Sequence, residues 1–193
     1  MTRTADHKVQ HQNNVELHAI LVEHLVGPIT SETLRDRLDD LEVSDKLTAS
    51  QGLAVRACLE LLAAQLDDAA SLLESAAECA QTDPERILVL HVKALLAVSK
   101  GDDSVALRAA LDALWIDADP HLWTFFLMIA HQTHRPDVVE ATLKAFAGFN
   151  FFDDGELKSA LCCSDYLDGI REYATYQDVV APHLARATNR NCN

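Results

Sequence analysis

The sequence is poor in glycine, proline and aromatic residues. It has 6 Gly and 5 Pro in 193 residues, and only 6% of the chain is aromatic. A many-turned β-sandwich uses glycine and proline at its turns, so this composition argues against one. The apolar 49% of the chain is mostly Ala, Leu and Val, residues that suit closely packed helices. We therefore expect an all-α protein, long enough for one compact domain or a short solenoid.

Basic residues are also scarce. The chain has 16 Lys and Arg against 30 Asp and Glu, which gives a formal net charge of −14. Without a cluster of Lys and Arg, such a chain repels phosphate backbones, so no nucleic acid is expected among its partners. The acidity is typical either of a surface that keeps the fold soluble or of one that attracts a basic or amphipathic protein partner.

Long apolar stretches and a regular cysteine pattern are both missing. No run of about 18 apolar residues occurs, and the N-terminal residues MTRTADHKVQHQNN lack an apolar signal region. We expect no membrane partner and a cytoplasmic location. The odd set of five cysteines contains no CxxC pair, which favours reduced thiols; it comprises Cys58, Cys79, Cys162, Cys163 and Cys192.

The distribution of apolar residues predicts four regions. Residues 1–13 are polar and read as a disordered tail, and residues 14–52 as N-terminal helices. Residues 53–149 are rich in Ala and Leu and read as three helical hairpins. Residues 150–193 read as C-terminal capping helices followed by a loose tail.

The chain resembles itself at an offset of 36 residues (58 to 94). Asp83-Pro84 matches Asp119-Pro120, and in each case we expect Asp to accept hydrogen bonds from free backbone N–H groups while Pro occupies the first helical turn. Turn residues divide each of the three units into two helices; they lie at 65–68, 101–104 and 134–137. A repeated helical hairpin buries its faces on its neighbours, so these matches predict a stacked array.

These residues resemble tetratricopeptide repeats over 53–149. The small residues expected where helices approach are Cys58 and Ala94 in the first helices and Ala70 and Ala106 in the second; Pro84 and Pro120 resemble the closing proline. The resemblance implies antiparallel helical hairpins stacked as a short tetratricopeptide-like solenoid with helical N- and C-terminal caps. The period exceeds the usual thirty-four residues and the family's Trp-Leu-Gly-Tyr residues are absent, so a generic antiparallel helical array is the alternative.

Histidines and cysteines are the only side chains that raise the question of chemistry. His131 and His134 have a spacing that can place two imidazoles on one metal, but no third ligand follows at a fixed spacing. Cys162 and Cys163 are adjacent and have no evident base, which favours buried thiols. We therefore assign no catalytic residue, no metal site and no cofactor.

Most of the aromatic rings gather between Trp115 and Phe152. Either these rings seal the last hairpin against the cap, or some form a docking patch, because one helix face cannot bury the whole run Phe149, Phe151 and Phe152. By analogy with helical repeats, the first helices should line a groove. The partner-binding residues expected are His91, Lys93, Val98, Trp123 and Leu127, together with Phe149, Phe151 and Phe152.

The sequence therefore favours a non-enzymatic protein–protein interaction module, an adaptor or chaperone that binds a partner peptide or helix in an acidic helical-repeat groove. Two alternatives stay open. One is a structural subunit that forms a homo-oligomer through a solenoid end, and the other is a histidine-dependent metal protein or enzyme.

Overall fold

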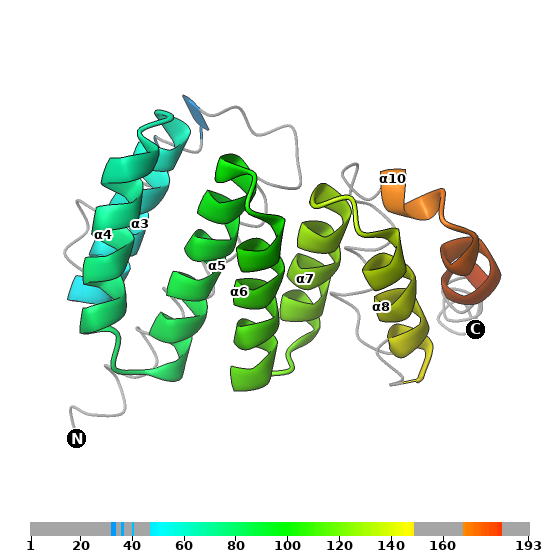
Figure 1. Cartoon of the computed structure of the whole chain (residues 1–193). Helices are drawn as coiled ribbons and strands as arrows, with labels where there is room; N and C mark the ends of the chain where they lie inside the picture. The colour runs from blue at the N-terminus through cyan, green and yellow to red at the C-terminus, as the bar shows by residue number, and fades with distance from the viewer. Residues whose placement is uncertain (1–31, 34–35, 37–39, 41–46, 149–167, 183–193) are drawn as a thin grey trace, which may run out of the picture. The chain divides into compact units, whose positions relative to one another are not determined.

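The computed structural model describes residues 32, 33, 36, 40, 47–148 and 168–182 (Figure 1). Within these residues the chain forms helices and turns and no strand, in agreement with the predicted all-α class. None of the described helices combines the length and the apolar character needed to cross a membrane. The chain divides into two compact units between Ile116 and Asp117.

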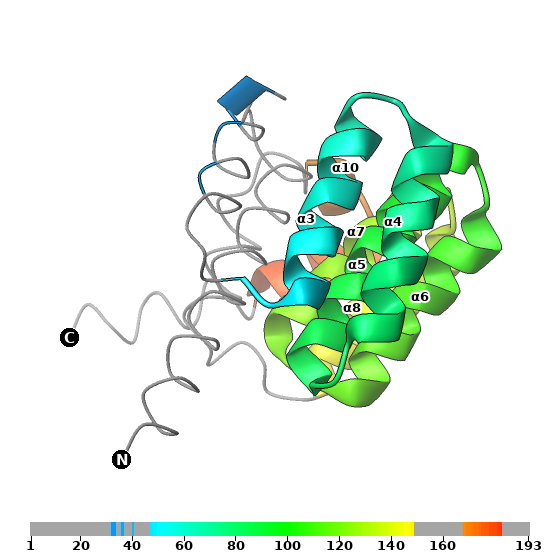
Figure 2. The same cartoon turned by 90° about the vertical axis from the view of Figure 1, so that its left-hand side faces the viewer.

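The residues described in the first unit form two hairpins. Helices α3 (Ala49–Leu62) and α4 (Leu66–Cys79) form the first, and α5 (Asp83–Lys100) and α6 (Asp103–Ile116) form the second. Each pair packs together, and α5 also packs against both helices of the preceding hairpin, as Figure 2 shows for α3, α4 and α5. The two hairpins therefore stack on each other.

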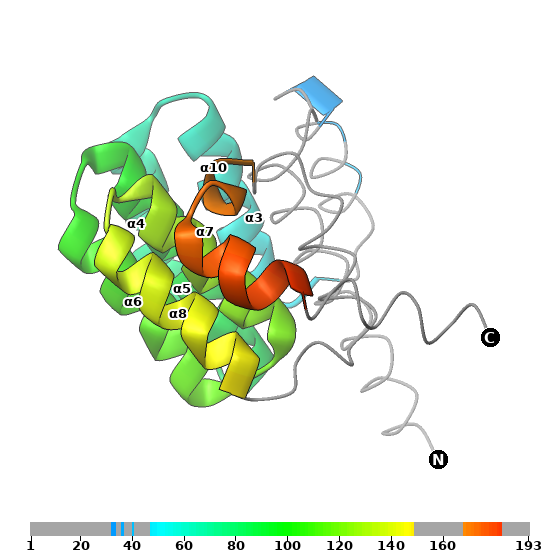
Figure 3. The same cartoon turned by 90° about the vertical axis from the view of Figure 1, so that its right-hand side faces the viewer.

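The second unit holds one hairpin and a short C-terminal part. Helices α7 (Pro120–Gln132) and α8 (Pro136–Gly148) pack as the hairpin. Helix α10 (Asp168–Arg171) precedes η3 (Tyr176–Val180), a π-helical segment that lies beside α8 (Figure 3). The predicted tail 1–13, most of the predicted helices in 14–52, and residues 150–167 and 183–193 of the predicted cap lie outside the described residues.

The first helix of every hairpin ends in the same turn. Ala64, Gly101 and His134 adopt left-handed backbone angles, with φ of 59°, 73° and 51°. In each case the following N–H donates to the carbonyl five residues back, over 2.9, 2.8 and 3.0 Å: Gln65 to Glu60, Asp102 to Ala97, and Arg135 to Ala130. This is the Schellman arrangement, and the second helix begins two residues after the left-handed residue. The turn gives the three hairpins a common register.

This register corrects the constant offset of 36. The turns are 37 residues apart (64 to 101) and then 33 (101 to 134). The spacing varies because α5 has 18 residues and α7 has 13. Ala106 is consequently equivalent to Ala69 and Val139, and these side chains are 0%, 1% and 0% exposed. The predicted pairing of Ala106 with half-buried Ala70 was wrong by one position.

The two prolines lie in the first turns of α5 and α7, as predicted. The capping side chain of α5 is different from the one expected, because the Thr82 hydroxyl accepts the hydrogen bond from the Glu85 N–H. The Asp83 carboxylate instead pairs with Arg86 at 3.1 Å. Helix α3 also begins earlier than the predicted repeat start at residue 53, since Thr48 caps it.

Small residues form much of the interior of the first unit. Alanines occupy buried positions on all four of its helices, where a larger side chain would push neighbouring helices apart. Those with no exposed surface include Ala54, Ala57, Ala76, Ala94, Ala106 and Ala113. Larger residues such as Leu73, Leu88 and Val92 fill the space between helices. Stacking therefore depends on small side chains at the helix contacts.

Ala106→Glu should destabilise the second hairpin by about 3–5 kcal/mol, because it buries a carboxylate with no compensating partner. Ser104→Glu is the matched control, since Ser104 is exposed on the same helix. Thermal unfolding followed by circular dichroism measures both. An Ala106→Glu melting temperature equal to that of Ser104→Glu would contradict the packing of α6.

Ala64→Gly should raise the free energy of unfolding by roughly 0.5–1 kcal/mol, because Gly adopts a left-handed angle without the steric cost that Ala has there. Gly101→Ala is the reciprocal change and should lower stability by about 1 kcal/mol. A Cβ at Gly101 would meet no atom within 4 Å, so the backbone angle alone sets its effect. Urea unfolding measures the change in the free energy of unfolding for both variants. If Gly101→Ala stabilised the protein, the left-handed turn at this position would be wrong.

Candidate functional site

The common register shows where the expected groove residues lie. His91 is equivalent to Ala54 and Thr124, and all three side chains are buried. Leu127 is equivalent to Ala57 and Ala94, which have no exposed surface either. His91 and Leu127 therefore belong to the side of the first helices that faces the core, and they do not offer a surface to a partner.

The other expected groove residues are more accessible. Lys93 is exposed on α5, as is its equivalent Arg56 on α3. Val98 is half-buried. Trp123 is half-buried as well, and its ring lies edge-on to Phe126 with centroids 6.5 Å apart. Of the five inner-helix predictions, Lys93 alone is exposed.

The aromatic residues separate into distinct environments. Phe125 and Phe126 are buried in the second unit, as expected for core rings. Trp115, near the end of α6, is 80% exposed, and it is the only large hydrophobic residue so exposed in the described part of the chain. Phe149, Phe151 and Phe152 lie outside the described residues, so the choice between a docking patch and a seal remains a prediction for them.

On each of α3 and α5, three exposed or half-buried residues follow one another along one side of the helix. Leu53, Arg56 and Glu60 follow one another on α3, and Arg86, Leu90 and Lys93 on α5, at the three- and four-residue spacings of one helix face. We name these six residues the first-helix face. Arg56, Arg86 and Lys93 are exposed, while the two leucines are half-buried.

Sequence reasoning found only Lys93 among these six residues. The signal for Arg86 and Leu90 was present, because they precede Lys93 at i−7 and i−3 on the same predicted helix. Arg56 was harder to find, because the offset of 36 pairs Lys93 with the buried Ala57. The correct match needs the register of the turns.

The second helix of the first hairpin has the opposite charge. All charged side chains of α4 are acidic and exposed: Asp67, Asp68, Glu74 and Glu78. Lys100 of α5 reaches Asp67 at 3.6 Å. Apart from Glu60 on α3, the acidic residues within the two helices of the hairpin thus lie on α4, and basic residues predominate on the first-helix face.

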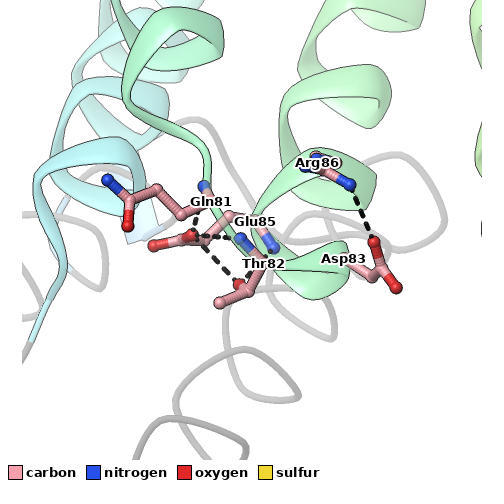
Figure 4. A network of polar contacts seen from close by, with 5 residues as sticks. All are labelled: Gln81, Thr82, Asp83, Glu85 and Arg86. Atoms are coloured by element: carbon pink, nitrogen blue, oxygen red, sulfur yellow. Dashed lines mark hydrogen bonds and ion pairs between the residues drawn. The ribbon is translucent and has the colours of Figure 1, made fainter.

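A single buried carboxylate joins the beginnings of α3 and α5. One oxygen of Glu85 accepts hydrogen bonds from the Gln81 and Thr82 N–H groups, both at 2.9 Å, and from the Thr82 hydroxyl at 3.0 Å (Figure 4). Its other oxygen accepts from the Thr48 hydroxyl at 2.6 Å. Thr48 and Thr82 are the N-cap residues of α3 and α5, so Glu85 connects two capping boxes.

These hydrogen bonds also set the pKa of Glu85. Burial of the carboxyl raises its pKa, but the hydrogen bonds from Thr48, the Thr82 and Gln81 backbones and the Thr82 hydroxyl outweigh burial, and the net pKa lies below its usual value. The group is therefore ionised at neutral pH, when it can accept every one of these bonds.

The histidine pair has two different environments. The His131 ring packs edge-on to Tyr173, with centroids 6.2 Å apart, and it lies so close to Gly169 that a Cβ there would be 2.7 Å from Nε2. His134 is exposed in the left-handed turn. In the described ranges, no three His, Cys, Asp or Glu side chains gather as metal ligands would.

The described cysteines differ in exposure. Cys58 lies in the core of the first unit, and burial raises the pKa of its thiol to about 12. It is therefore protonated at neutral pH and behaves as a small hydrophobic residue. Cys79 is exposed at the end of α4.

No protein-family model matches the sequence, and no curated protein or solved structure matches it at a significant level.

Glu85→Gln should lower the free energy of unfolding by about 1–3 kcal/mol at neutral pH, because an amide nitrogen replaces one oxygen that accepts hydrogen bonds. Glu78→Gln is the matched control on the exposed face of α4, and it should change stability by less than about 0.5 kcal/mol. Urea unfolding at about pH 7 measures both variants.

The same pair of variants tests the pKa of Glu85. Because the folded-state pKa is lowered, the stabilisation is fully present above the unfolded value of about 4.3 and is lost as pH falls through the folded value. The stability difference between the native chain and Glu85→Gln should therefore shrink in acid. A difference that stays constant from about pH 7 to about pH 3 would show that the carboxylate charge is irrelevant.

Proposed function

We propose that this chain is a non-enzymatic protein-interaction module with tetratricopeptide-like stacking, and that it binds a peptide or helix of a partner on its first helices. The observation that carries the proposal is the packing of α5 against both helices of the preceding hairpin. Such stacking brings the first helices of successive hairpins side by side, and helical-repeat proteins bind their partners on surfaces of this kind.

The local structure of the first unit supports this role in a second way. The bond from Thr48 to Glu85 holds the beginnings of α3 and α5 together, and the short connections between helices make α3 and α5 run in the same direction (Figure 1). Their accessible stripes consequently lie next to each other. A rigid surface loses little conformational entropy when a partner binds, which favours affinity.

A cytoplasmic adaptor or chaperone is the form of this function that we propose. An adaptor requires a stable scaffold with accessible charged and apolar residues, and α3 and α5 provide both on one face. The charge of −14 would keep such a protein soluble while it handles a client. The proposal rests on this surface rather than on the fold alone, since one fold serves many functions.

The test is purification of the tagged full chain from its native host, followed by mass spectrometry and light scattering. A partner should co-purify in a stoichiometric amount with the native chain and with Ser104→Glu, and Ala106→Glu should lose it because the second hairpin no longer folds. Failure to recover any stoichiometric partner would count against the function. A homo-oligomer of the chain alone would instead favour the structural-subunit alternative.

A further inference from the structure

We infer that the first-helix face binds an acidic, amphipathic helix of a partner protein. This inference rests on the proposed function and specifies the chemistry of its partner. It differs from the expectation of a basic partner, which came from the net charge of the whole chain. The local charge of the face points to the opposite sign.

The apolar part of the face consists of Leu53 on α3 and Leu90 on α5. Both leucines are half-buried, so each still presents apolar surface between charged neighbours. Leu53 also packs partly against the core of the first unit. Two parallel, adjacent helices that each present one such leucine can bind a third helix between them. A partner helix with apolar residues at i, i+3, i+4 and i+7 would place them against these leucines.

The charged part of the face is mainly basic. Arg56, Arg86 and Lys93 are exposed beside the two leucines, and Glu60 is the only acidic member of the face. Arg86 pairs with Asp83 at 3.1 Å, but both side chains are more than half exposed. Surface pairs of this kind contribute only about 0–1 kcal/mol, so Arg86 can exchange Asp83 for a carboxylate of a partner.

The acidity of the rest of the chain does not prevent such binding. Four exposed carboxylates of the first hairpin belong to α4, which packs against α3 and α5. At physiological ionic strength the screening length is about 8 Å, shorter than the typical width of a helix at about 10 Å. A bound helix therefore responds chiefly to the residues it touches.

The experiment uses the full chain and a fluorescein-labelled peptide of about 18 residues, or five turns. The peptide contains Leu on one face and Glu and Ala elsewhere, and its matched partner has Lys in place of Glu. Fluorescence anisotropy at about 0.15 M salt measures binding. We expect the Glu peptide to bind the native chain at least tenfold more tightly than the Lys peptide.

Two double variants with the same change in net charge locate the site. Arg56→Glu with Lys93→Glu reverses the charge of the first-helix face from mainly basic to mainly acidic. This double variant should weaken binding of the Glu peptide at least tenfold. Arg108→Glu with Lys144→Glu reverses two exposed residues on α6 and α8, and it should change binding less than twofold. Absence of binding to the native chain, or equal weakening by the two double variants, would overturn the inference.

Other occupants of the face give distinct results. If the acidic residues of the chain's own segment 30–45 occupy it, Arg56→Glu with Lys93→Glu will lower the melting temperature without any peptide, by much more than the control variant does. If a second copy occupies it, light scattering will show a dimer that this variant dissociates. Either result overturns the inference.

The native partner separates failure of this inference from failure of the proposed function. A partner that co-purifies equally with the native chain and with Arg56→Glu plus Lys93→Glu would leave the protein-binding function standing and remove the face as its site. Loss of the partner from this variant, with retention by Arg108→Glu plus Lys144→Glu, is the result that we expect.

Discussion

The stacking of the first two hairpins depends on one carboxylate at the beginnings of α3 and α5. Glu85 completes the capping box of its own helix and also accepts a hydrogen bond from Thr48, the N-cap residue of α3. Burial opposes its charge, and four donors compensate for that cost. Because the same group serves two helix beginnings, α3 and α5 start side by side, and the face that they share follows from that arrangement.

Much of this architecture could be predicted from the sequence, because the residues that begin or end a helix act through their own backbone geometry. Pro84 and Pro120 mark helix beginnings through their own backbone geometry, and Gly101 marks a helix end in the same way. Ala64 and His134 adopt the same left-handed conformation without the residue type that announces it. The register therefore could not be read from residue types, and the offset of 36 placed Ala106 opposite Ala70 instead of Ala69.

The candidate site was harder to predict for a related reason. Burial of His91 and exposure of Lys93, two residues apart on one helix, depend on which side of α5 meets α3 and α4. Net charge predicted a basic or amphipathic partner, which stays a prediction. It averages over α4, whose charged residues are all acidic, and so it does not describe the mainly basic first-helix face. To predict the charge of one surface, one must know which helices are neighbours, and the amino-acid composition contains no such information.

The extra length of α5 makes the two ends of this surface unequal. In the register of the turns at Ala64 and Gly101, the first residue of α3 corresponds to Arg86, so α5 begins three residues earlier than α3, or about 5 Å at 1.5 Å per residue. A helix that lies along α3 and α5 therefore contacts both of them at one end of the pair and chiefly α5 at the other. The surface formed by α3 and α5 therefore has a direction, and it can distinguish the two orientations in which a partner helix could bind along it.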